Sequence, residues 1–153
     1  MPMDEQLRAL GRISVAFNQL EYRMNVLVWG LISPNSNIGR IALEGENFDR
    51  MLGKLKNLAQ EVLREDQERL RRIEEWANSA SDVKRRRNEL LHAQWGLYKD
   101  TGSMRGQTLL RKVVRNVDST DLDRLADDVD AALQELIDLM EELEKFPQLS
   151  FKL

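Results

Sequence analysis

The sequence lacks the residues on which several kinds of site depend. It has no cysteine, which excludes disulfide bonds and thiolate metal sites. Its one histidine, His92, follows Glu89 in a single Glu-x-x-His spacing, whereas a di-metal centre in a helical bundle needs two such pairs, so we expect no bound metal and no other cofactor. The longest apolar run, residues 26–32, is too short to cross a bilayer, and no basic-then-apolar segment opens the chain. We therefore expect a cytoplasmic protein without membrane contact.

The composition is that of a globular helical protein. Hydrophobic residues make up 42% of the chain and charged residues 32%. A length of 153 residues suits one domain with a sizeable core, so we expect residues 1–153 to form a single domain. The net charge of −3 says little about partners, because a small total hides local patches.

Apolar residues recur every three or four positions in four segments, which predicts four amphipathic helices. The first helix runs from Asp4 to Ile32 and ends at Ser33-Pro34. The second follows a predicted N-cap at Asn47 and spans 48–63. The third helix begins after residue 66 and stops near residue 95. The last helix opens with a predicted capping box of Thr120 and Asp123.

The segment from residue 96 to residue 117 has a different pattern. Two stretches that suit strands flank Asp100-Thr101-Gly102-Ser103, which has the composition of a turn. This predicts a short β-hairpin, or otherwise an irregular loop. The predicted fold is therefore all-α: a four-helix bundle with a short β-hairpin or loop inserted before the last helix.

Arg87 lies where the apolar stripe of the third helix calls for a leucine. The other residues on this stripe are apolar: Ile73, Trp76, Ala80, Val83 and Leu90. Burying an unpaired guanidinium is expensive. We therefore expect Arg87 to meet an anion, a partner chain or a solvent-filled cleft.

The only histidine, His92, follows five positions after Arg87. At roughly 100° per residue, the two side chains point about 140° apart on a regular helix. A long arginine side chain, a kink, or a two-fold-related copy of the helix would bring them together. Asn88 lies one turn before His92, which is close enough to orient the imidazole ring.

These residues resemble the motif of HEPN-domain ribonucleases. In that family an arginine, commonly followed by Asn, Asp or His, precedes a histidine by four to six residues, late in a helix of an all-α bundle. Here Arg87 and Asn88 precede His92, with four residues between the arginine and the histidine. The segment from Phe17 to Glu21 is also similar to the opening helix of many HEPN proteins.

The resemblance implies a homodimer that cuts RNA without a metal. His92 would be the general acid or base at the ribose 2′-OH or the leaving 5′-oxygen. Arg87 would neutralise charge on the phosphoryl oxygens, and Asn88 would position the ring or the phosphate. Because the nucleophile is the substrate's own 2′-OH, DNA would not be cut. The implied setting is a toxin or a phage-defence system.

The same resemblance assigns RNA contacts to the flanking residues. Lys84, Arg85 and Arg86 would hold neighbouring phosphates, although such a run is also typical of a solvated face. Trp95 would stack a base or pack against the hairpin. Some HEPN toxins carry a tyrosine after the motif histidine that a nucleotidyltransferase antitoxin modifies, but here Ala93 follows. An antitoxin protein remains an implied partner.

Two alternatives stay open at this point. In the first alternative, the chain is a non-catalytic HEPN-like module that binds a protein or nucleotide partner. In the second alternative, Arg87 pairs with Glu21 or Glu89 within the chain, and His92 faces solvent without a catalytic role.

Overall fold

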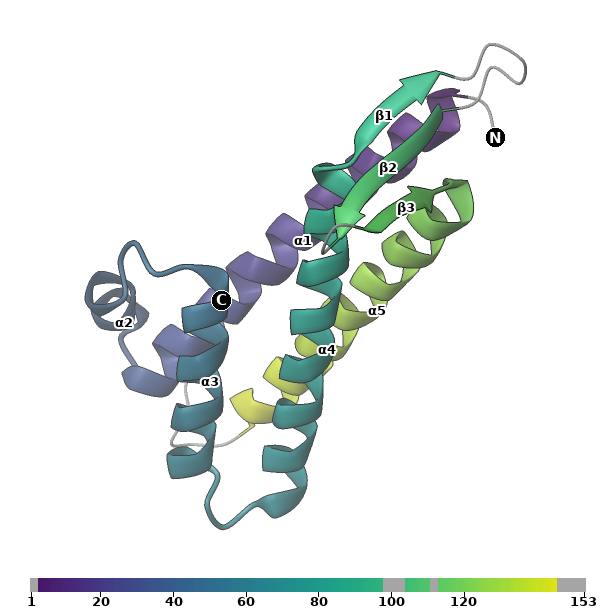
Figure 1. The fold of residues 1–153 in the computed structure, drawn as a ribbon. Coiled ribbons are helices and arrows are strands. Elements are labelled where there is room, and N and C mark those ends of the chain that lie inside the picture. The colour runs from purple at the N-terminus through teal and green to yellow at the C-terminus, as the bar shows by residue number, and fades with distance from the viewer. Residues whose placement is uncertain (1–2, 98–103, 111–112, 146–153) are drawn as a thin grey trace.

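The computed structural model describes the backbone of residues 3–97, 104–110 and 113–145, and the side chains of residues 4–93 and 118–145. Five helices dominate this part of the chain (Figure 1): α1 (Met3–Ile32), α2 (Ser36–Ala42), α3 (Phe48–Val62), α4 (Gln67–Leu91) and α5 (Ser119–Glu144). The predicted helical class is therefore confirmed. Within the described ranges, no helix is both long and apolar enough to span a membrane.

The apolar stripes of α1, α3, α4 and α5 meet in one core. Helix α1 contacts α5, α3 and α4, and α4 also packs on α5 and α3. Trp76 of α4 is fully buried, and its indole Nε1 donates a hydrogen bond to the carbonyl oxygen of Ala132 in α5 at 2.8 Å. At the rim, Arg72 of α4 donates to Glu142 of α5 at 2.7 Å. Direct packing of α4 on α5 thus fixes the helix that carries Arg87.

The helix boundaries confirm one predicted cap and correct another. The Asn47 side chain caps α3 by accepting a hydrogen bond from the backbone N–H of Arg50 at 3.0 Å, as expected. Helix α5 begins earlier than predicted, because Asp118 and Asp121 form the capping box instead of Thr120 and Asp123. An aspartate at the N-cap accepts hydrogen bonds from the free N–H groups of the first turn at least as well as a threonine, so the helix begins at the pair of Asp118 and Asp121.

Helix α4 ends at residue 91, four residues before the predicted stop. The chain then enters a three-stranded antiparallel sheet in the order β1 (Gln94–Leu97), β2 (Met104–Leu110) and β3 (Val113–Val117). The prediction of a two-stranded hairpin was therefore short by one strand. The predicted turn at 100–103 lies outside the described residues. Figure 1 shows the strands at the far end of the molecule from α2.

Helix α2 was missed, because its segment has no apolar stripe and reads as a polar loop. The side chain of Asn35 caps it by accepting from the backbone N–H of Asn37 at 3.1 Å. The helix lies against the end of α1, where Gly39 meets Trp29. A Cβ atom on Gly39 would lie 2.5 Å from the Cα of Trp29, which is closer than atoms can approach. The missing side chain therefore lets α2 dock.

We predict opposite effects on stability for two Gly→Ala substitutions. Gly39→Ala should lower the free energy of unfolding by about 1–3 kcal/mol, because α2 must move away from the Trp29 backbone. Gly53→Ala should raise it by about 0.5–1 kcal/mol, because Gly53 lies inside α3 with open space around its missing Cβ. Urea denaturation measures both. If both substitutions changed the free energy of unfolding in the same direction, this would contradict the described contact between Gly39 and Trp29.

Candidate functional site

Arg87 lines a hollow of about 320 Å³ between α1, α3 and α4. Its walls come from three helices and one helix cap: Phe17, Glu21, Asn47, Phe48, Asp49, Lys84, Arg87 and Asn88. Of the three surroundings expected for Arg87, the structure therefore shows the cleft. The apolar stripe of α4 reaches Arg87 one turn after Val83. The side chains of α1 and α3 leave a space at this position, and the arginine side chain fills part of that space.

An aromatic face holds the guanidinium of Arg87. Its Cζ lies 5.0 Å from the ring centroid of Phe17, and the Phe17 ring packs on Phe48 with centroids 5.2 Å apart. The Nη1 atom donates to the side-chain oxygen of Asn88 at 3.1 Å. Such a cation–π contact orients an arginine without neutralising its charge.

No carboxylate in the described part of the chain forms an ion pair with Arg87. Glu89, one expected partner, accepts a hydrogen bond from Arg85 at 2.7 Å instead. Glu21, the other, lines the hollow, but no ion pair joins it to Arg87. The Nε atom of Arg87 is buried and has no hydrogen-bond partner there. The hollow thus contains a half-buried cation with unused hydrogen-bonding capacity.

The three basic residues before Arg87 are in a different situation, because each is already paired. Lys84 binds Asp49 of α3 at 2.6 Å, and Arg86 binds Asp128 of α5 at 2.7 Å. These contacts tie α4 to its neighbours. Lys84 and Arg86 therefore serve the packing of the helices, and an RNA phosphate would have to displace a carboxylate to reach either of them.

Arg85 is engaged along its own helix. Its hydrogen bonds to Asp82 at 2.5 Å and to Glu89 at 2.7 Å raise the pKa of its guanidinium. The hydrogen bond from Arg85 in turn holds the pKa of Asp82 below its ordinary value. The pair with Asp82 is largely exposed, so water screens it, whereas the side chain of Glu89 is only 14% exposed.

His92 is exposed and caps the C-terminus of α4. Its backbone N–H donates to the carbonyl oxygen of Asn88 at 3.0 Å. The side-chain oxygen of Asn88 accepts from Arg87, so in this arrangement it serves the arginine and not the imidazole. Arg87 and Asn88 line the hollow, but His92 does not. One chain alone does not bring the arginine and the histidine together.

The side chain of Trp95 lies outside the described residues. Among residues 4–93 and 118–145, no group of three or more His, Asp or Glu side chains is arranged to hold a metal ion.

Sequence reasoning missed the aromatic platform under Arg87. Phe17 and Phe48 both lie on apolar stripes and read as ordinary core residues. The available signal was that Phe17, Phe48 and Arg87 each occupy a stripe position on a different helix. Stripes of packed helices face one another, so an arginine on one of them must meet the side chains of the others.

Two neighbouring arginines should respond oppositely to replacement by methionine. Arg87→Met should leave the free energy of unfolding unchanged or raise it by up to about 1 kcal/mol, because it removes a half-buried charge that no carboxylate among the described side chains compensates. Arg86→Met should lower it by about 1–2 kcal/mol, because Asp128 loses its partner. Urea denaturation distinguishes them. A larger loss for Arg87→Met would show that this arginine is structural.

Comparisons of the chain with protein-family models, with curated proteins and with solved structures each found no match. The side chains of this chain are therefore the only guide to its function.

Proposed function

We propose that this protein is a metal-independent endoribonuclease of the HEPN type, built on a four-helix bundle of α1, α3, α4 and α5. The observation that carries the proposal is the state of Arg87. Its guanidinium is half-buried, lies on the face of Phe17, lacks a carboxylate partner in the described part of the chain and faces a hollow. An arginine so placed suits the binding of a phosphate.

The proposed reaction uses the substrate's own 2′-hydroxyl as nucleophile. A histidine acting as base removes the proton from the 2′-OH, and the 2′-oxygen attacks the adjacent phosphorus. The bond between phosphorus and the 5′-oxygen breaks, and this oxygen takes up a proton from water as it leaves. The products are a 2′,3′-cyclic phosphate and a free 5′-hydroxyl. Arg87 stabilises the charge on the phosphoryl oxygens during the transfer.

The proposal requires a homodimer. Because His92 is exposed and lies outside the hollow that Arg87 lines, a second copy is needed to complete the site. The exposed C-cap position leaves the His92 ring accessible to a partner chain. The setting that we propose is a cytoplasmic toxin or defence system, held in check by an antitoxin protein.

One observation favours a second candidate, a non-catalytic HEPN-like module that binds a protein or nucleotide partner. The basic residues expected to hold flanking phosphates, Lys84, Arg85 and Arg86, are all paired with carboxylates. RNA binding must therefore exchange these pairs, whereas a module that binds another partner through Arg87 need not disturb them.

The two candidates are separated by RNA cleavage in the presence of EDTA. The purified wild-type protein should cut single-stranded RNA, leave 2′,3′-cyclic phosphate ends and spare DNA of the same sequence. Arg87→Ala and His92→Ala should each reduce the rate by at least about a hundredfold. Arg64→Ala, which removes an exposed arginine in the turn that follows α3, is the matched control and should cut like the wild type. Equal behaviour of all four proteins would favour the module.

Mixed dimers test the sharing of the site between subunits. A dimer of one Arg87→Ala chain and one His92→Ala chain keeps one intact arginine and one intact histidine, on different subunits. If the site is shared, this mixed dimer should cut faster than either parent. A monomeric wild-type protein, measured by light scattering at the assay concentration, would contradict the proposal.

A further inference from the structure

A second hollow lies on the opposite side of α1 from Arg87. It has a volume of about 530 Å³ and is formed by α1 and α2. Its described walls contain no carboxylate: Gln19, Tyr22, Arg23, Val26, Trp29, Ser36, Asn37 and Arg40. At roughly 100° per residue, Tyr22 and Val26 point away from Phe17 and Glu21, which line the Arg87 hollow. We call this second hollow the α1–α2 groove.

The two arginines of the α1–α2 groove are free of ion pairs, as far as the described side chains extend. Lys84, Arg85 and Arg86 all have carboxylate partners, whereas Arg23 and Arg40 have none in that part of the molecule. Arg40 also lines a neighbouring hollow with Glu44 and Glu46 but forms no ion pair with either, so two guanidinium groups contribute positive charge to the α1–α2 groove. This charge favours an anionic ligand.

Aromatic side chains supply the second feature. Tyr22 is exposed over 63% of its surface, although such a ring normally finds an apolar neighbour. Trp29 is only partly buried, and the close contact of Gly39 with its backbone fixes the wall on which it lies. Flat apolar rings beside guanidinium groups are the combination with which proteins hold nucleobases.

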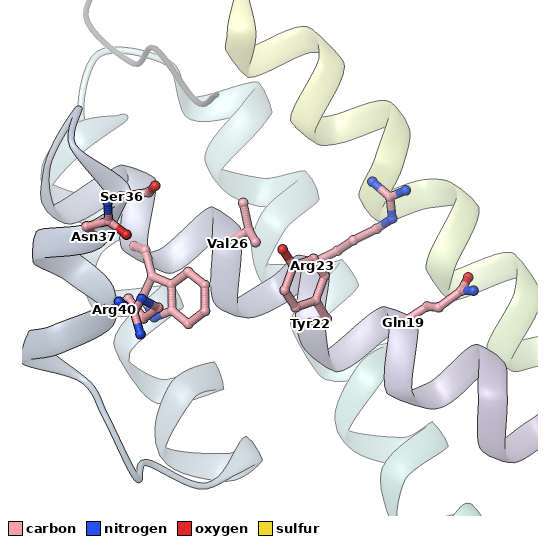
Figure 2. A pocket seen from close by; sticks show the side chains of 8 residues that line it. Gln19, Tyr22, Arg23, Val26, Ser36, Asn37 and Arg40 are labelled. Carbon is pink, nitrogen blue, oxygen red and sulfur yellow. The ribbon is translucent and has the colours of Figure 1, made fainter. Parts of the chain in front are cut away.

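The polar groups divide between the two ends of the groove. Figure 2 shows Ser36, Asn37 and Arg40 together at the α2 end, and Tyr22, Arg23 and Gln19 toward the other end. The α2 end offers a hydroxyl, an amide and a guanidinium, which suit a phosphate. The other end offers a ring face and an amide.

The floor between the two ends is apolar. Val26 lies there, between Tyr22 and the α2 end (Figure 2). Along α1 the groove extends from Gln19 to Trp29, which corresponds to about 15 Å at 1.5 Å per residue. This length accommodates a ring joined to a phosphate through a sugar.

We infer that the α1–α2 groove binds a mononucleotide, with its phosphate at Arg40 and its base over Tyr22 and beside Arg23. This site is separate from the one used in the proposed ribonuclease reaction, because it shares no described lining residue with the Arg87 hollow. Binding is therefore expected whether or not the protein cuts RNA.

Calorimetric titration with adenosine 5′-monophosphate tests the inference. The wild-type protein should bind this nucleotide with one site per chain, and adenosine and inorganic phosphate should each bind at least about tenfold more weakly. Arg40→Ala and Tyr22→Ala should each raise the Kd for the nucleotide about tenfold or more. Both side chains are exposed, so circular dichroism should show both variants folded.

The controls separate the groove from other sources of binding. Arg64→Ala removes the same charge elsewhere and should leave the Kd unchanged, as should Arg87→Ala. Absence of nucleotide binding at millimolar concentration would overturn the inference. So would phosphate binding as tightly as the nucleotide, or an equal loss in Arg64→Ala. A change of oligomeric mass in Tyr22→Ala would identify the groove as a contact between copies and would also overturn it.

Discussion

The contact between the Arg87 guanidinium and the Phe17 ring is the interaction on which the proposed function depends. An arginine on an apolar stripe is normally neutralised by a carboxylate, and here an aromatic face and an amide oxygen take that place. The charge therefore persists at a half-buried position where water screens it less than at the surface. A site of this kind gives up some stability for the capacity to bind an anion.

The rest of the helical body keeps this arrangement in place. The buried hydrogen bond of Trp76 to α5 fixes α4, and the pairs of Lys84 with Asp49 and of Arg86 with Asp128 hold α4 against α3 and α5. Lys84, Arg85 and Arg86 each pair with a carboxylate, whereas Arg87 pairs with none within the described part of the chain. An arginine without a carboxylate partner beside paired basic residues is the feature that would distinguish an anion-binding site from an ordinary charged helix surface.

The long helices were predictable because each has an apolar stripe of helical period and most have a cap, such as Asn47. Helix α2 was not predictable, since its docking depends on a close approach of Gly39 to Trp29 that no local pattern reveals. The exceptional position of Arg87 could be inferred from its stripe, and the stripes of the other helices indicated that it meets their side chains, but the pattern did not say which ring it meets. Phe17 comes from a distant segment, and only tertiary packing brings it under the guanidinium.

The most direct measurement is nitrogen-resolved NMR of the arginine Nε–H groups during titration with a 2′-O-methyl RNA, which cannot be cleaved. The Arg87 Nε–H signal should shift in a saturable way as a phosphate binds the guanidinium and changes its electronic environment, while the signal of the control Arg64 should stay in place. An Arg87 signal that does not respond to saturating RNA would contradict the claim that this guanidinium is available to an anion.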